Sequence, residues 1–439
     1  MKIAIVGGGI SGLIAAEDLR DRHDVTLLEA RPALGGHTHT VDVTLHGRRY
    51  AIDTGFIVFN DRTYPRFCRR LEEWGVASDP TDMSFSVRDD AARLEYNGST
   101  LNGLFAQRRN LFSPRFHRLI RDILRFNREG TALALDPPGD EITVRRFLED
   151  GRYSRAFADQ YLLPMGAAIW SCPTGTFEQF PMRFIAEFYH HHGLLSIRDR
   201  PQWRVIRGGS RTYIEALLRR WNGGVRLRLG TSVEGARRGP DGVELDLAGG
   251  ERETFDHVIF ACHSDQALRI LRDPGDAERE VLSGFPYSRN IAVLHTDVRF
   301  LPRRRRAWAS WNYLCRSEDA SAPATLTYCM NILQHIASND VFCVTLNCEE
   351  AIDPARVLGR FVYEHPIFSV RRRALQTRHA ELLGRNRTSY CGAYWGNGFH
   401  EDGVASGMAA AAAVHRLAGT GPSEAASPPP PQGSLLTAS

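Results

Sequence analysis

The sequence of 439 residues has almost no lysine: Lys2 is the only one among 55 basic side chains, and the others are arginines. A catalytic lysine is therefore excluded everywhere except at the second residue. There are 51 acidic side chains, so the net charge is only +4. That charge is too small to indicate a nucleic-acid-binding protein, and we expect no nucleic-acid partner.

Paired cysteines and long hydrophobic runs are missing as well. The eight cysteines are spaced singly, without a CxxC pair, so no zinc or other metal site is indicated. No apolar run reaches the length of about 18 residues that a membrane-spanning helix needs. The first residues lack the pattern of a signal peptide. We therefore expect a cytoplasmic protein with reduced thiols and no metal.

What the sequence does contain is typical of a globular protein. Hydrophobic residues make up 43% and charged residues 24% of the chain, which excludes disordered, collagenous and coiled-coil classes. The length suggests roughly two or three domains. Residues 420–439, with a proline run at 428–431, are predicted to form a disordered tail.

The first 30 residues carry the pattern of a dinucleotide-binding βαβ unit. An apolar run over 2–6 predicts a buried parallel strand, and 10–20 and 24–28 are predicted as the following helix and strand. The glycines that join the first strand to the helix, with the spacing GxGxxG, are Gly7, Gly9 and Gly12. These elements in this order are a strong signature. The alternative is an ordinary glycine-rich turn.

Each part of this motif has a physical task. The first glycine permits the tight turn, the second lets the backbone approach a pyrophosphate, and the third lets the helix lie close to the strand. The helix begins at Ile10 and Ser11, and its free N–H groups favour phosphate. Glu29, at the end of the second strand, can accept hydrogen bonds from an adenosine ribose. We predict a dinucleotide site here.

The segments that follow resemble the flavin amine oxidase and carotenoid desaturase superfamily. Residues 29–37 read EARPALGGH, and residues 52–56 read IDTGF. The resemblance implies FAD rather than NAD. In these two segments it assigns the FAD contacts to Ala30, Arg31, Gly35, Gly36, His37, Thr54, Gly55 and Phe56. The superfamily usually has an arginine after the glycine pair, where this chain has His37.

Residues 390–407, YCGAYWGNGFHEDGVASG, resemble the C-terminal FAD motif of the same superfamily. An alanine-rich helix is expected from near Asp402 to about Leu417, with its positive N-terminal end facing the flavin. Strand signals also occur at 225–229, 243–247 and 256–261, and the last is expected to close the sheet. The further FAD contacts that the resemblance implies are Val233, Gly398, Asp402, Gly403 and Val404.

The resemblance implies an α/β fold. A Rossmann-like FAD-binding domain of the glutathione-reductase and amine-oxidase type would carry an inserted mixed α+β substrate-binding domain. The FAD-binding domain is expected to comprise residues 1–83, 205–285 and 385–419. The substrate-binding domain is expected at residues 84–204 and 286–384.

Four segments resemble a bacterial branch of the superfamily: Leu101–Asn110, Leu111–Arg128, Pro164–Pro173 and Arg200–Tyr213. That branch is often encoded beside cyclopropane-fatty-acyl-synthase-like methyltransferases and includes the flavin desaturase of furan fatty acid synthesis. The resemblance implies desaturation of a methyl-branched fatty acyl chain of a phospholipid by hydride transfer to flavin N5. It also suggests a lipid-modifying methyltransferase as a neighbour.

The catalytic residues are less well defined. Typical flavin amine oxidases place a lysine near flavin N5, and this chain has none for that role. His400 and Glu401 are candidate bases, and Tyr394 and Trp395, with Phe399, are expected to form an aromatic wall. Aromatic side chains can also bind an amine. An amine oxidase that makes hydrogen peroxide therefore stays open, as does a flavin isomerase or scaffold without net redox turnover.

Three other segments have two interpretations each. Residues 112–128 predict an amphipathic helix with Phe116, Leu119, Ile120, Ile123 and Leu124 on one face and Arg118, Arg121, Arg125 and Arg128 on the other. Such a helix contacts an anionic membrane peripherally or is an ordinary surface helix. The basic cluster at 303–306 is a second such contact or a solvated loop. The histidines at 190–192 are expected to be structural, although one could face a substrate channel that residues 164–170 would line.

Overall fold

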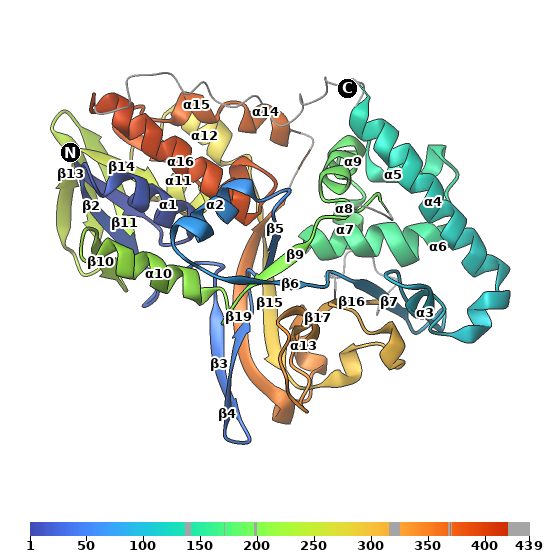
Figure 1. The fold of residues 1–439 in the computed structure, drawn as a ribbon. Helices are drawn as coiled ribbons and strands as arrows, with labels where there is room; N and C mark the ends of the chain where they lie inside the picture. The colour runs from blue at the N-terminus through green and yellow to red at the C-terminus, as the bar shows by residue number, and fades with distance from the viewer. Residues whose placement is uncertain are drawn as a thin grey trace.

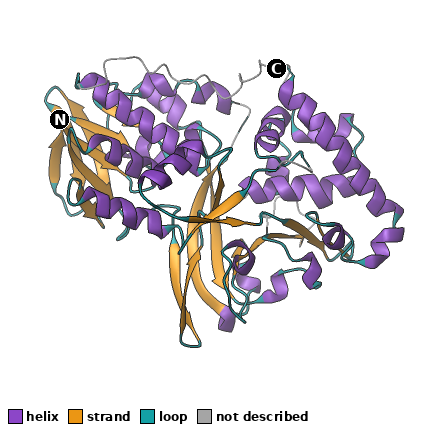
Figure 2. Cartoon of the chain, viewed as in Figure 1, coloured by secondary structure: helices purple, strands orange, loops and turns teal. Residues whose placement is uncertain are grey.

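The computed structural model describes residues 1–136, 142–170, 172–196, 200–315, 325–367, 369 and 371–419. The predicted tail at 420–439 lies outside the described residues. Figures 1 and 2 show two units side by side, one organised around a parallel sheet and the other around helices and a second sheet. Within the described ranges, no helix is both long enough and apolar enough to cross a membrane.

The first unit contains a five-stranded parallel sheet in the order β10-β2-β1-β14-β20. Its strands are β1 (Lys2–Val6), β2 (Asp24–Glu29), β10 (Arg226–Leu229), β14 (His257–Phe260) and β20 (Thr388–Tyr390). The predicted strands at 2–6 and 24–28 are confirmed. The expectation that the strand at 256–261 closes the sheet is wrong, because β20 pairs with the outer side of β14.

Helices and a smaller sheet pack against the two faces of this sheet. The helices of the first unit are α1 (Ile10–Leu19), α2 (Pro65–Glu73), α10 (Arg211–Trp221), α11 (Ser264–Ile270), α12 (Asp276–Leu282), α14 (Arg372–Gln376), α15 (His379–Leu382) and α16 (His400–Leu417). The smaller antiparallel sheet consists of β11 (Val233–Gly239), β12 (Gly242–Leu247) and β13 (Arg252–Phe255). Buried residues on one face of the parallel sheet pack against α1, α2, α10 and α16, and those on the other face pack against the smaller sheet and α11, α12, α14 and α15. Val6 and Leu28 of the parallel sheet share a buried core with Leu245 of β12.

Helices α1 and α16 pack closely because glycines face α1. A Cβ atom on Gly407 would lie 2.5 Å from the Ser11 carbonyl oxygen, and one on Gly403 would lie 2.7 Å from the Ile10 side chain. Helix α16 begins at His400, earlier than the predicted start near Asp402. The reason is that the Asp402 carboxylate accepts a hydrogen bond from the Phe399 N–H at 2.9 Å and so caps the helix.

The second unit is built on a seven-stranded sheet in the order β19-β15-β18-β17-β16-β7-β8. Its strands are β7 (Phe85–Asp89), β8 (Leu94–Asn97), β15 (Tyr287–His295), β16 (Trp311–Cys315), β17 (Leu326–Cys329), β18 (Cys343–Leu346) and β19 (Val357–Pro366). Strand β7 pairs in parallel with β16. Two segments far apart in the sequence therefore form one sheet.

Most helices of this unit lie between the two halves of that sheet in the sequence. They are α3 (Leu101–Leu104), α4 (Pro114–Leu135), α5 (Val144–Asp150), α6 (Arg155–Phe157), α7 (Leu163–Trp170), α8 (Thr174–Phe177), α9 (Met182–His191) and, later in the chain, α13 (Met330–Leu333). Figure 1 shows α4 to α9 gathered on the side away from the parallel sheet. The helix predicted at 112–128 corresponds to α4.

Short strands connect the two units. They are the hairpin β3 (Thr40–Leu45) with β4 (Arg48–Asp53), and the small sheet of β5 (Val58–Asn60), β6 (Ser78–Thr81) and β9 (Trp203–Ile206). The domain boundary placed between residues 204 and 205 falls inside β9. Because β9 pairs with β5 and β6, that boundary runs through one sheet rather than through a linker.

Candidate FAD and substrate site

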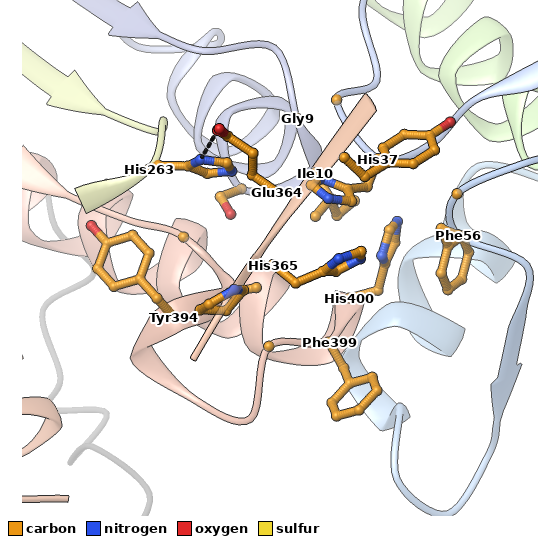
Figure 3. Close-up of a pocket in the computed structure, with 18 of the residues that line it drawn as sticks. Gly9, Ile10, His37, Phe56, His263, Glu364, His365, Tyr394, Phe399 and His400 are labelled. Carbon is orange, nitrogen blue, oxygen red and sulfur yellow. Dashed lines mark ion pairs between the residues drawn. The ribbon is translucent and has the colours of Figure 1, made fainter. Parts of the chain in front are cut away.

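A cavity of about 860 Å³ extends from the carboxyl ends of β1 and β2 into the second unit. Cofactor and small-molecule sites usually have volumes of this size. In an α/β sheet, ligands bind outside the carboxyl ends of the strands, so the position of the cavity is also the expected one. Figure 3 shows its central part, where side chains from both units face one another.

The glycine-rich turn forms one end of the cavity, which we call the nucleotide end. The predicted contact residues that line the cavity here are Gly7, Gly9, Ile10, Ser11, Glu29, Ala30, Arg31, Gly35, Gly36, His37 and Val233. Gly7 has φ +115°, and a Cβ atom on it would lie 2.7 Å from the Ala261 carbonyl oxygen. Around Gly9, by contrast, no atom lies within 4 Å of the position of a Cβ. The backbone there is open to a ligand.

Glu29 is held at this end by backbone hydrogen bonds. Its Oε2 accepts from the Gly8 N–H at 2.7 Å, and its Oε1 accepts from the Arg31 N–H at 2.9 Å. Each carboxylate oxygen has two lone pairs, so both retain capacity for the hydroxyls of a ribose. The residues around Glu29 thus fit the adenosine part of FAD.

Five predicted cofactor contacts are not among the described residues that line the cavity: Gly12, Thr54, Asp402, Gly403 and Val404. They support its wall from behind. A Cβ atom on Gly12 would lie 2.0 Å from the Gly7 carbonyl oxygen, and Val404 is completely buried. The Thr54 hydroxyl is hydrogen bonded to the Tyr363 hydroxyl at 2.8 Å. The roles of these five residues toward the cofactor stay predictions, and in the structure they pack behind the residues that line the cavity.

Gly55, Phe56, Tyr394, Gly398, Phe399 and His400 line the middle of the cavity. The His400 ring stacks on Phe56 with centroids 3.5 Å apart (Figure 3), and its Nε2 lies 3.0 Å from the Thr38 hydroxyl oxygen. Burial lowers the pKa of His400 to about 3. This imidazole is therefore neutral at physiological pH.

Two of the other candidate catalytic residues, Glu401 and Trp395, are not among the described residues that line the cavity. The Glu401 carboxylate accepts hydrogen bonds from the Arg66 and Phe67 N–H groups at 3.1 and 3.0 Å and pairs with the Arg66 guanidinium. It is bound to the first turn of α2 and does not line the cavity. The Trp395 ring stacks on His379 at 4.0 Å and also lies outside the described lining. Tyr394 lines the cavity, and burial raises the pKa of its hydroxyl.

Three histidines meet beside the glycine-rich turn, which the sequence did not predict. The His37 and His365 rings have centroids 5.3 Å apart, and those of His37 and His263 are 6.3 Å apart. His263 Nδ1 lies 3.4 Å from a Glu364 carboxylate oxygen (Figure 3). The Asn290 amide donates a hydrogen bond to His365 Nδ1 at 3.0 Å. Burial lowers the pKa of His365 to about 4, so it is neutral.

The far end of the cavity, which we call the chamber, is formed mainly by the second unit. Its described lining residues are Ile57, Val58, Tyr64, Met83, Ser84, Phe85, Met165, Ile169, Trp170, Phe188, His192, Leu194, Trp203, Trp311 and Tyr328. No Asp, Glu, Lys or Arg is among them, whereas the described lining of the cavity as a whole also contains Glu29, Arg31, Glu234, Arg269 and Glu364. Met165 and Ile169 lie one turn apart on α7, whereas Ala167 and Ala168 of the same helix are buried in the core. One face of this helix therefore lines the cavity and another lies in the core, and the substrate channel itself stays a prediction.

His192 is the member of the histidine triplet that lines the chamber. Its Nδ1 lies 2.9 Å from the Phe188 carbonyl oxygen. A carbonyl oxygen only accepts hydrogen bonds, so Nδ1 carries the hydrogen and Nε2 has the lone pair. Burial lowers the pKa of His192 to about 4. In the part of the chain that the structure describes, no group of His, Cys, Asp or Glu side chains is arranged to hold a metal ion.

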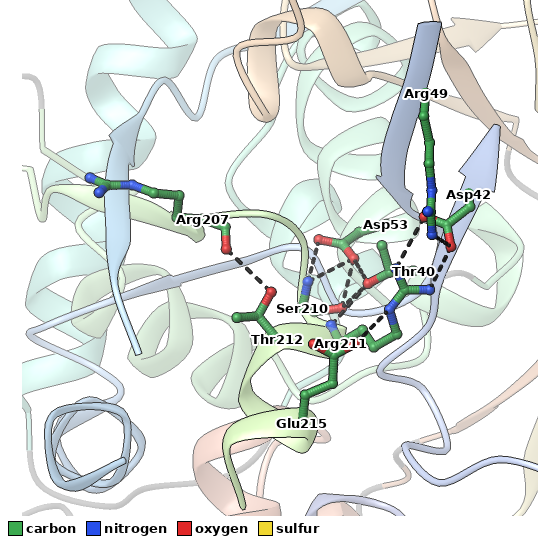
Figure 4. A network of polar contacts seen from close by, with 9 residues as sticks. All are labelled: Thr40, Asp42, Arg49, Asp53, Arg207, Ser210, Arg211, Thr212 and Glu215. Carbon is green, nitrogen blue, oxygen red and sulfur yellow. Dashed lines mark hydrogen bonds and ion pairs between the residues drawn. The ribbon is translucent and has the colours of Figure 1, made fainter. Parts of the chain in front are cut away.

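A buried polar network positions the segment that leads into Gly55 and Phe56 (Figure 4). Asp53 is completely buried, and its Oδ1 accepts from the Thr40 hydroxyl at 2.6 Å and the Ser210 hydroxyl at 2.7 Å. The Gln334 amide donates to Oδ2 at 3.1 Å. Burial raises the pKa of Asp53 to about 6. This carboxylate joins the β3–β4 hairpin, the start of α10 and the second unit behind the cavity wall.

The sequence profile of the family described as flavin containing amine oxidoreductase matches residues 10–306. The chain belongs to this family. It is accordingly an FAD-dependent oxidoreductase, and the residues of the nucleotide end fit that cofactor. Glu29 would hold the adenosine ribose, and the open backbone at Gly9 and Ile10 would hold the diphosphate.

Comparisons with individual proteins add the fold and one local sequence match. The chain is 36% identical to the carotenoid phi-ring synthase of Chlorobaculum tepidum over 64 residues, which cover 14% of this chain and 10% of that protein. The structure resembles cyclohexylamine oxidase from Brevibacterium oxydans IH-35A, with a TM-score of 0.67, 15% identity and coverage of 95% and 99% of the two chains. It also resembles a CLA-producing fatty acid isomerase from P. acnes, with a TM-score of 0.66, 15% identity and coverage of 95% and 98%. The identity of 15% to each of these two solved structures shows a shared fold and nothing finer.

Proposed function

We propose that this oxidoreductase desaturates the methyl-branched acyl chain of a phospholipid. The observation that carries the proposal is the apolar chamber, whose described lining has no charged carboxylate or guanidinium. A hydrocarbon chain gains free energy by leaving water for such a surface. Among the chamber residues a protonated amine would lose its hydration without meeting a counter-charge, because the described carboxylates of the cavity, Glu29, Glu234 and Glu364, are not among them. The local match to a carotenoid synthase and the fold of a fatty acid isomerase support the same direction.

FAD, when bound, supplies the acceptor for a hydride. The chain's own residues then have two tasks. The apolar side chains of α7 and α9 orient the acyl chain and exclude water. His192 Nε2 is the proton acceptor in the chamber, because its lone pair is not engaged by the Phe188 carbonyl. The substrate would lose a hydride from one carbon and a proton from the next, and the electron pair left between them forms the double bond.

The test is anaerobic reduction of the flavin by candidate substrates. The holoenzyme is mixed with phospholipid carrying methyl-branched chains, with the straight-chain phospholipid as matched control, and with cyclohexylamine. The expected result is bleaching of the flavin absorption band by the branched lipid only, with a new double bond in the recovered chain by mass spectrometry. Bleaching by the amine alone would overturn the proposal in favour of an amine oxidase. Bleaching by none of them, with the flavin still reducible by dithionite, would overturn it as well.

A further inference from the structure

The most exposed large apolar side chains lie on one small region of the second unit. Phe112 is 87% exposed and Leu101 is 77% exposed, and Leu111 beside them is 43% exposed. Single exposed apolar residues are normal on a protein surface, but contiguous ones mark an interaction site. The region comprises α3, the short helix at Arg108–Phe112 and the first turns of α4.

Contacts within the region show that it is continuous. The Phe105 ring lies 5.7 Å from the Phe116 ring at the start of α4. Arg108 donates a hydrogen bond to the Asn102 side chain at 2.6 Å, and His117 Nε2 lies 2.8 Å from the Leu111 carbonyl oxygen. Figure 1 shows α3 and α4 at the edge of the molecule away from the parallel sheet. We call this region the α3–α4 surface.

Arginines surround the exposed apolar side chains. Arg115, Arg118 and Arg121 are exposed, and no ion pair to them occurs within the described ranges. The second basic cluster of the sequence joins this surface, because the short helix Arg305–Ala307 contacts α3. Arg305 and Arg306 are exposed there. Two basic segments that are almost 200 residues apart therefore adjoin this region, one by its contact with α3 and the other as the start of α4.

The structure also changes the composition of the basic face predicted for residues 112–128. Arg125 does not belong to it, because this side chain donates to the Gly151 carbonyl at 2.7 Å and its guanidinium lies 3.7 Å from the centre of the Tyr153 ring. Leu124, expected on the apolar face, is 48% exposed. The basic residues available for a partner are therefore those of the first two turns of α4 and those near residue 305.

We propose that the α3–α4 surface docks on an anionic lipid bilayer. Exposed Leu and Phe side chains insert into the interface between headgroups and acyl chains, and arginines around them pair with lipid phosphates. The exposed arginines of α4 and those at Arg305 and Arg306 complement a negatively charged membrane, whereas Arg303 and Arg304 pair with Asp90 and Glu95. The inference rests on the proposed function in one respect: a phospholipid substrate gives the enzyme a reason to sit on a membrane.

The test measures binding of the holoenzyme to vesicles by co-sedimentation. Vesicles of phosphatidylcholine with phosphatidylglycerol are compared with vesicles of phosphatidylcholine alone, all with straight chains. The charge variant carries Arg115→Gln, Arg118→Gln and Arg121→Gln, and the apolar variant carries Leu111→Ser and Phe112→Ser. The matched control removes three exposed arginines of the first unit: Arg219→Gln, Arg237→Gln and Arg416→Gln.

We expect binding to the anionic vesicles only, weakened at least about tenfold in both surface variants and by higher salt, because each interfacial arginine adds to the attraction. The control variant should bind as the wild type does. Absence of vesicle binding, or equal binding of all variants, would overturn the proposal. Self-association that disappears with Leu111→Ser and Phe112→Ser, without vesicle binding, would assign the surface to a second copy instead.

Failure of this inference is distinguishable from failure of the proposed function. If vesicles do not bind but detergent-dispersed branched phospholipid still reduces the flavin, the docking surface is wrong and the substrate is right. If vesicles bind but no lipid reduces the flavin, the surface stands and the substrate is wrong.

Discussion

The two ends of the cavity are built in different ways. The nucleotide end is made of backbone: glycines whose missing side chains leave space, the N-terminus of α1, and Glu29 fixed by two N–H groups. The chamber is made of side chains that come from residues 57–85, 165–203 and 311–328. The first design fixes one ligand and tolerates little change. The second permits the shape of the site to change with single substitutions.

The interactions that hold the walls of the cavity in place also differ between its two ends. Behind the flavin region, the buried carboxylate of Asp53 binds three segments through directional hydrogen bonds. In the wall of the chamber, Trp170 packs among aromatic rings, with Phe188 at 4.9 Å and Phe177 at 5.8 Å. Apolar packing is non-directional and tolerates exchange of similar volumes. Substrate specificity is thus easier to alter than cofactor identity.

The largest effect is expected from Gly9→Val at the nucleotide end. The backbone at Gly9 is extended with φ −75°, so valine fits the apoprotein, and its side chain would occupy only the space open to the cofactor. We expect FAD affinity to fall at least about a hundredfold while the thermal transition of the apoprotein changes little. The measurement is FAD fluorescence titration of the apoprotein. Gly12→Val is the contrasting variant, which should fail to fold because its side chain would collide with the Gly7 carbonyl.

The next effect in size is expected from Glu29→Ala. The variant loses the carboxylate that the ribose hydroxyls would bind and leaves the Gly8 and Arg31 N–H groups without their acceptor. Hydrogen bonds to a charged group contribute about 1.5–3 kcal/mol each. We expect FAD occupancy of the purified protein to fall sharply, as measured by absorption at the flavin band against protein. Full occupancy would remove Glu29 from the site.

A substitution in the chamber should lower the rate of flavin reduction by lipid without changing FAD binding at the nucleotide end. Ile169→Glu places a carboxylate on the face of α7 that lines the chamber, where an acyl chain would have to desolvate it. We expect normal FAD content and a rate of flavin reduction by branched lipid at least about tenfold lower. Ile169→Leu is the matched control and should react nearly as the wild type does. If Ile169→Glu is reduced by lipid as fast as the control, the chamber does not bind the acyl chain.

The same contrast explains how much the sequence could predict. The turn of Gly7, Gly9 and Gly12 could be found from the sequence because the three residues lie close together in the chain. The tight turn, the approach of the pyrophosphate and the close packing of helix on strand each require a glycine. The motif could not separate residues that touch a ligand from residues that support them. Asp402 caps its own helix, and Glu401 binds the first turn of α2, although both belong to the recognisable segment.

The chamber and the histidine group could not be predicted in detail, because they depend on contacts between distant segments. His37 precedes β3 and His365 lies on β19, so two rings whose centroids are 5.3 Å apart come from opposite ends of the sequence. The available signal was weak: alternation along β19 places Tyr363 and His365 on one face of the strand. His192 was one of three equivalent neighbours until the end of α9 fixed which one reaches the cavity.

The smallest effect concerns acid stability and compares one histidine from each unit. Burial lowers the pKa of His257, the first residue of β14 in the parallel sheet, and of His192, in the chamber, to about 4. An unfolded imidazole takes up a proton near pH 6.5. Each histidine therefore contributes stability that is complete above about pH 6.5 and is lost as the pH falls toward 4, by at most about 1.4 kcal/mol per pH unit. Urea unfolding between pH 7 and 5 should show a smaller slope for His257→Gln than for the wild type. His192→Gln should reduce the slope by a similar amount, because burial lowers both pKa values to about 4. Equal slopes for all three proteins would show that neither ring stays neutral in the folded state.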